Sequence, residues 1–154
     1  MRIRKAKLDD LDQIAGLCAD LQTYHDKFDP TFLMVKDAEK MLKKFLKPRI
    51  RSRKDFIVVA EEGDRLVGYV HMVIVLRPPI FKNRPYGFVM DAVVSKGYRG
   101  RGIGTKLMAK SYAWLRKKGI RRVELFVHGL NKPGRRFWER EGFETTILRQ
   151  ARRV

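Results

Sequence analysis

The stretch Tyr98-Arg99-Gly100-Arg101-Gly102-Ile103-Gly104-Thr105 decides the fold. An apolar run over 88–94 precedes it and an amphipathic helical pattern over 103–115 follows it, so the glycines are predicted to lie at a strand-to-helix turn. Glycine allows a close backbone approach and φ values that other residues avoid. The first N–H groups of a helix are unpaired, and its dipole favours an anion. With two arginines adding charge, the stretch predicts a phosphate-binding turn.

Two common phosphate-binding patterns do not fit this turn. The dinucleotide pattern G-x-G-x-x-G fails because Thr105 stands at its third glycine, and the P-loop fails because Ile103 stands where lysine is needed. What fits is Arg99-x-x-Gly102-x-Gly104. A glycine-rich turn in some other α/β protein remains the alternative.

The chain has 154 residues, 44% of them hydrophobic and 34% charged, which predicts a soluble single domain over residues 1–154 with a real core. It contains no apolar run of about 18 residues, so no membrane span is expected. The N-terminus lacks an apolar signal core, and the lone Cys18 cannot form an internal disulfide. We therefore expect a cytoplasmic protein, with Cys18 buried in a helix.

The net charge of +18 is concentrated in the C-terminal third of the chain. Residues 99–154 hold 16 basic and 4 acidic side chains, and the predicted anion site lies among them. Such a field steers polyanionic ligands. Contact with nucleic acid or the ribosome is a competing use of the same charge, although no known nucleic-acid motif is present.

Periodicity and turn residues predict an alternation of strands and helices. We expect a basic loop over 48–54, and a helix over 37–47 that turns Met41 and Phe45 inward. The remaining predicted strands cover 3–7, 56–60, 66–76, 87–94, 123–127 and 145–148, and the remaining predicted helices begin near 8, 103 and 131.

A second motif follows the glycine turn: Asn131-Lys132-Pro133-Gly134-Arg135-Arg136-Phe137-Trp138-Glu139-Arg140-Glu141-Gly142-Phe143. It resembles motif B of the GCN5-related N-acetyltransferase (GNAT) family, N-x-x-A-x-x-F-Y-E-x-x-G-F, as Arg99-x-x-Gly102-x-Gly104 resembles motif A. Gly134 replaces the alanine, and Trp138 replaces a tyrosine that commonly protonates the departing thiolate. Indole N–H donates a hydrogen bond but does not titrate usefully.

The resemblance spans residues 1–148 and implies a GNAT-like acyl-CoA N-acyltransferase fold: an α/β (α+β) protein with a central, mixed, mostly antiparallel sheet and helices on both faces. It implies acetyl-CoA as cosubstrate, and an acceptor site formed in part by the chain segment that connects the first strand to the second. The residues that would bind coenzyme A are Ala92, Val93, Val94, Arg99, Gly100, Arg101, Gly102, Ile103, Gly104, Thr105, Asn131, Phe137 and Trp138.

The implied reaction is acetyl transfer to a primary amine by direct attack within a ternary complex. Asp91 and Trp138 are the candidate catalytic residues. Asp91 is an acid in an apolar strand, which points to a proton-transfer role or to a structural partner such as an arginine. His128 is a further candidate proton relay, or an ordinary loop-edge histidine.

The remaining expectations concern other ligands and partners. His25 and His71 share no metal-ligand spacing, so no metal site is expected. A homodimer stays open. The alternative function is a basic, non-catalytic module that binds coenzyme A and associates with nucleic acid or the ribosome. The replaced tyrosine, and the absence of the glutamates that relatives carry where Met90 and Phe126 stand, favour this alternative.

Overall fold

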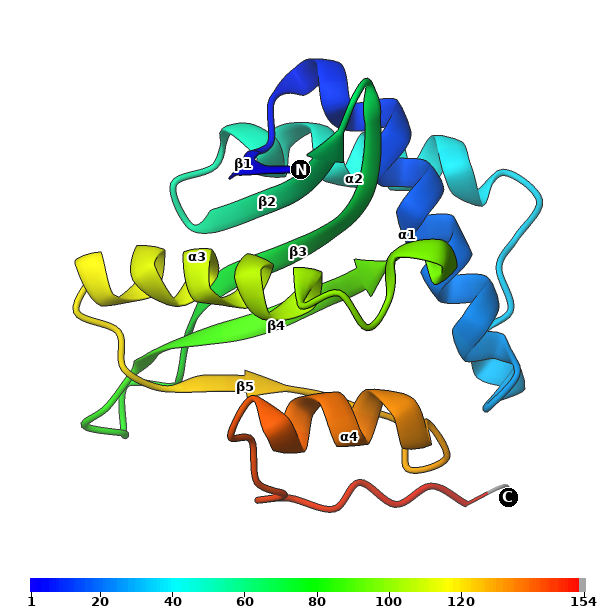
Figure 1. The fold of residues 1–154 in the computed structure, drawn as a ribbon. Coiled ribbons are helices and arrows are strands. Elements are labelled where there is room, and N and C mark those ends of the chain that lie inside the picture. Colours follow the sequence, from blue (N-terminus) through cyan, green and yellow to red (C-terminus); the bar gives the residue numbers. More distant parts are fainter. Residues whose placement is uncertain (153–154) are drawn as a thin grey trace.

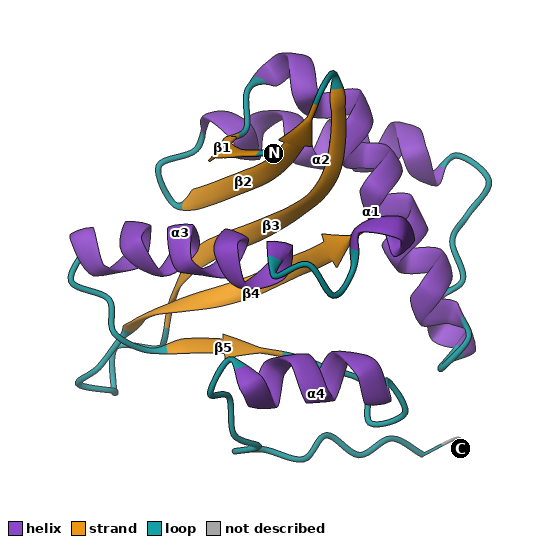
Figure 2. Ribbon diagram, viewed as in Figure 1, coloured by secondary structure: helices purple, strands orange, loops and turns teal. Residues whose placement is uncertain are grey.

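The computed structural model describes residues 1–152, which form one five-stranded sheet with helices on both faces (Figures 1 and 2). The strands are ordered β1-β2-β3-β4-β5; all neighbours are antiparallel except β4 and β5, which are parallel. The elements are β1 (Arg2–Lys5), α1 (Leu11–Asp26), α2 (Ala38–Arg51), β2 (Asp55–Glu62), β3 (Arg65–Leu76), β4 (Pro85–Val94), α3 (Ile103–Lys117), β5 (Val123–Leu125) and α4 (Lys132–Arg140). The predicted fold class is confirmed.

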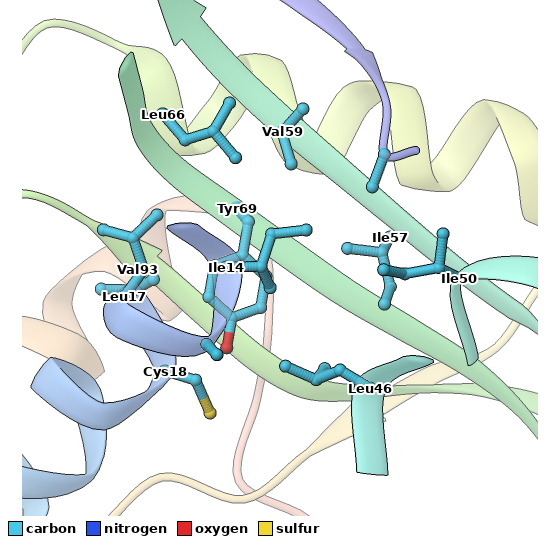
Figure 3. Packing of buried hydrophobic residues seen from close by; sticks show 12 residues of the cluster. Ile14, Leu17, Cys18, Leu46, Ile50, Ile57, Val59, Leu66, Tyr69 and Val93 are labelled. Carbon is cyan, nitrogen blue, oxygen red and sulfur yellow. The ribbon is translucent and has the colours of Figure 1, made fainter. Parts of the chain in front are cut away.

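The sheet divides the core into two layers. Successive strand residues point to opposite faces, so β2, β3 and β4 each contribute to both layers. One layer lies against α1 and α2, and Figure 3 shows Tyr69 and Ile57 of the sheet packed among Ile14, Cys18 and Leu46 of these helices. The other layer contains α3 and the half-buried aromatic rings of α4. The predicted burial of Cys18 in a helix is confirmed.

Strands β4 and β5 separate where the glycine turn approaches. Their pairing covers only Gly87–Val89 with Val123–Leu125, whereas β4 continues to Val94 (Figure 2). The pairing of β3 with β4 shifts register at the same place: His71 pairs with Asp91 and Met72 with Val89, which leaves Met90 as a bulge. Bulges bend a strand and re-aim side chains, often near active sites.

Helix α2 differs from the sequence prediction in length and orientation. The expected loop over 48–54 is wrong in its first half, because α2 continues through Pro48 to Arg51. Leu46 and Ile50, four residues apart, are buried, and this packing outweighs the break that proline favours. Met41 and Phe45 were expected to face inward but are 59% and 37% exposed.

The C-terminal segment also departs from the prediction. Residues 145–148 form no strand, and Ile147 and Leu148 are 81% and 80% exposed. The predicted strand over 123–127 ends at Leu125, and Phe126 is 78% exposed. A strand forms only where it can pair with a neighbouring strand. Residues 126–127 and 145–148 have an alternating pattern but pair with no strand among the described residues.

A charged cluster joins the first strand to the rest of the sheet. The Arg4 guanidinium donates hydrogen bonds to both oxygens of Asp10, at 2.7 and 2.8 Å, and to both oxygens of Glu61, at 3.0 and 2.6 Å. Arg4 and Asp10 are nearly buried, so the pairing is well shielded from solvent.

Among residues 1–152, none of the helices has the length and apolar character that a membrane span requires.

Candidate active site

The glycine stretch forms the turn between β4 and α3, as the sequence predicted. Gly100 and Gly102 have φ values of +76° and +71°, in the left-handed region that favours glycine. Gly102 caps α3 without help from any described side chain, and the first helical hydrogen bond runs from Lys106 N–H to its carbonyl. The N–H groups of Ile103, Gly104 and Thr105 thus remain at the helix N-terminus, suited to an anion.

Both arginines of the turn are held near it by aromatic rings. Arg99 Nε donates to the Val94 carbonyl at 2.9 Å, and its guanidinium carbon lies 5.8 Å from the Tyr24 ring centroid. Arg101 lies 5.1 Å from the Tyr98 ring centroid. Both side chains are exposed, so their charges are available to a bound phosphate group.

The start of helix α4 is connected to this turn through Tyr24 of α1. The Asn131 side chain accepts a hydrogen bond from Gly134 N–H at 3.0 Å and another from the Tyr24 hydroxyl at 3.3 Å. A Cβ at Gly134 would lie 2.5 Å from Asn131 Nδ2, so alanine at this position would require the Asn131 side chain to shift. Tyr24 of α1 therefore contacts both Arg99 and Asn131, a connection that the sequence analysis did not predict.

Phe137 and Trp138 pack within α4 and against α3. A Cβ at Gly104 would lie 3.0 Å from two ring atoms of Phe137, so this glycine allows α4 to approach the helix. The Trp138 ring makes edge contacts with Phe137 and Phe143, at centroid distances of 4.7 and 5.4 Å. These are packing contacts, and the binding and catalytic roles of the two residues stay predictions.

Asp91 lies on β4 directly after the bulge, and its side chain is 12% exposed. Its Oδ2 is 3.9 Å from Nδ1 of the buried His71, and no arginine lies within ion-pair distance in the described chain. Burial raises the pKa of Asp91, and the neighbouring His71 ring and the hydroxyl of Tyr69 only partly oppose this rise. A carboxylate with a raised pKa is a stronger base.

Glu124 and His128 have structural partners. Glu124 accepts hydrogen bonds from Arg77 and Arg122, which makes it a structural strand residue. The His128 ring stacks on Phe28 at 5.5 Å, and its Nδ1 accepts from the Leu130 N–H. Among residues 1–152, no three His, Cys, Asp or Glu side chains group as metal ligands.

Two site residues were missed in the sequence. Asp55 and His71 lie on the same sheet face as Asp91, and His71 Nε2 is 2.7 Å from Asp55 Oδ1. The signal was a histidine within the apolar stretch predicted as the strand 66–76 and an aspartate directly before the strand predicted over 56–60. Their pairing depends on the register of β2 and β3, which a single sequence does not reveal.

Residues 20–143 match the model of the acetyltransferase (GNAT) family. The chain belongs to this family. Membership confirms the predicted family and the predicted enzyme class, an acetyl-CoA-dependent acetyltransferase. An uncharacterized N-acetyltransferase of Archaeoglobus fulgidus is 30% identical over 138 residues, which cover 90% of this chain and 89% of the relative.

Solved structures share this GNAT fold at low sequence identity. A tetramutant of the BH1408 protein from Bacillus halodurans has a TM-score of 0.90 at 20% identity, with all of both chains covered. A predicted acetyltransferase from Clostridium acetobutylicum, determined with acetyl-CoA, has a TM-score of 0.79 at 17% identity, covering 97% of this chain and 95% of the other. Both likenesses concern the fold alone.

Proposed function

We propose that this GNAT protein transfers the acetyl group of acetyl-CoA to a primary amine, by direct attack within a ternary complex. The observation that carries the proposal is the juxtaposition of two parts: an anion-binding turn at the start of α3, and a buried, basic Asp91 beside the opening between β4 and β5. The family supplies the reaction class. That the acceptor is an amine is inferred from Asp91, because a buried carboxylate can accept the proton that an ammonium group must lose.

The cosubstrate would lie along β4 and the glycine turn. Its pyrophosphate suits the free N–H groups at 103–105 and the charges of Arg99 and Arg101. The thioester arm suits the backbone of 92–94, because β4 has no β5 partner there. The Val94 carbonyl accepts a hydrogen bond from Arg99, so the backbone groups of Ala92 and Val93 are the better candidates. Bound there, the thioester supplies an activated acyl carbon.

Asp91 is proposed to accept a proton from the acceptor ammonium. Its raised pKa brings its basicity closer to that of the group that it must deprotonate. Trp138 is proposed to lie near the departing thiolate, at the position where the family has its tyrosine. A thiol has a pKa of only about 8.5, so the leaving group needs little proton assistance.

The experiment that tests the proposal is a thiol-release assay with pooled primary amines and peptides. Amine-dependent release supports acetyl transfer. Calorimetric binding of coenzyme A without release under any amine would favour the basic, non-catalytic module instead. The single domain over 1–154, the cytoplasmic location, the absence of a metal, and any homodimer or nucleic-acid contact remain predictions.

A further inference from the structure

Three ionisable side chains form a row across the sheet, behind the site proposed for the acceptor. Asp91 of β4 and His71 of β3 are direct cross-strand partners, with 3.9 Å between Oδ2 and Nδ1. Asp55 of β2 continues the row, 2.7 Å from His71 Nε2. His71 is fully buried, and the side chain of Asp55 is 9% exposed. Burying such groups costs free energy, so the row calls for a function.

The hydrogen bond to Asp55 fixes the tautomer of His71. An ionised carboxylate only accepts hydrogen bonds, so Nε2 of His71 must carry the proton. Its Nδ1, which faces Asp91, is then a lone-pair acceptor. Nδ1 is buried and has no hydrogen-bond partner among the described residues. The ring is thus oriented to receive a proton from the direction of Asp91.

Other groups that face the row do not supply this function. From α1, Cys18 and His25 approach it; burial raises the pKa of Cys18 to about 11 and lowers the pKa of His25, so both are neutral near pH 7. Burial also raises the pKa of Tyr69 well above its usual value. From α2, Arg49 Nε lies 3.9 Å from Asp55 Oδ1.

The chemistry of amide formation gives the row a task. An acceptor ammonium has three N–H bonds and the amide product has one, so two protons leave the nitrogen in each turnover. One proton is balanced by the departing thiolate, which becomes a thiol, and the other is released. A single carboxylate that has accepted the first proton cannot accept the second until it is emptied.

We propose that His71 and Asp55 form a proton store that empties Asp91 during turnover. This inference rests on the proposed function. The ammonium N–H bond breaks and an O–H bond forms on Asp91; that O–H bond then breaks and an N–H bond forms at Nδ1 of His71. A movement of about 1 Å closes the gap to hydrogen-bond length. Asp55 stabilises the resulting imidazolium, and the proton returns to solvent through Asp91 after the product leaves.

In this scheme His71 and Asp55 are positioning residues that act through Asp91. A role limited to packing would affect stability and not the pH dependence of turnover. The two roles are separated by His71→Gln, because the glutamine amide can still donate to Asp55 at the position of Nε2 but cannot take up a proton. Asp64→Asn, at the exposed β2–β3 turn, is the matched control for Asp55→Asn.

The test is kcat measured against pH for the wild type and these variants. We expect His71→Gln and Asp55→Asn to lower kcat about ten- to a hundredfold at pH 7, with KM for acetyl-CoA changed less than about twofold. The deficit should shrink as pH rises, because more of the amine then arrives already deprotonated. Equal activity, or a deficit that is the same at every pH, would overturn the proton store.

A second measurement needs no acceptor. Nitrogen-15 NMR of the wild type should show His71 as the Nε2–H tautomer at pH 7. An Nδ1–H tautomer would overturn the store alone. Absence of thiol release from the wild type with every amine would instead refute the proposed function, and the store with it.

Discussion

Replacing Gly102 by alanine separates the conformational role of this glycine from its role toward the cosubstrate. Gly102 has a φ of +71° and no atom within 4 Å of where a Cβ would lie. The cost to folding is therefore backbone strain alone, about 1–2 kcal/mol for a non-glycine residue in the left-handed region. For a chain of this size, that corresponds to a fall in Tm of about 2–8 °C.

Gly63 offers a matched control in the same molecule. It lies in the β2–β3 turn with a φ of +58°, and it too has open space around its missing Cβ. Gly63→Ala should therefore lose a similar amount of stability, measured by thermal or urea unfolding. Only at Gly102 does the added methyl group stand at the N-terminus of α3, where the pyrophosphate is proposed to bind.

The affinity for coenzyme A, measured by calorimetry, should distinguish the two variants. We expect Gly102→Ala to weaken binding at least about tenfold, or 1.4 kcal/mol, while Gly63→Ala binds like the wild type. Wild-type affinity in both variants, with both folded, would refute the assignment of the turn as the anion site. A similar loss in both would show that stability, and not the turn, controls binding.

Further predictions concern the carboxylate, the tryptophan and the charged cluster. Asp91→Asn should lower kcat about a hundredfold with unchanged coenzyme A affinity. Because burial raises its folded pKa, Asp91 weakens the fold once ionised, so Asp91→Asn should raise Tm at pH 7, with the gain vanishing near pH 4. Trp138→Tyr should keep the fold and maintain or raise turnover, whereas Trp138→Ala should cost about 3 kcal/mol of stability and weaken coenzyme A binding. Arg4→Met should cost about 3 kcal/mol at pH 7, measured by urea unfolding, because two carboxylates lose their partner. Burial opposes ionisation of Asp10, but Arg4 holds its pKa below the usual value. The stability lost in Arg4→Met should therefore shrink as the pH falls through the pKa of Asp10 in the folded wild type, where this carboxylate becomes protonated. A penalty for Arg4→Met that is independent of pH would contradict the pairing.

The parts of the fold that the sequence predicts well are those with local signals. The glycine turn, the start of a helix near 131 and most of the apolar strand and helix patterns depend on neighbouring residues, and the structure confirms them. Errors arose where distant packing decides the outcome. The burial of Leu46 and Ile50 carries α2 through Pro48, and the pattern at 145–148 finds no strand partner.

The same distinction applies to the site. The position of the glycine turn was predictable because its glycines and arginines are contiguous in the chain, and its anion-binding role remains a prediction. The row behind Asp91 was not, because Asp55 and His71 join it through strand register and the bulge at Met90. Tyr24 was likewise hidden, since its contacts with Arg99 and Asn131 join segments that are far apart in the sequence.

The most direct test of acetyl transfer follows a carbon-13 acetyl group from acetyl-CoA by NMR, in the presence of an amine that supports thiol release. The account predicts that the label appears as an amide of that amine, in step with the released thiol. Label recovered as free acetate, or retained on coenzyme A while the protein binds it, would contradict the proposed reaction.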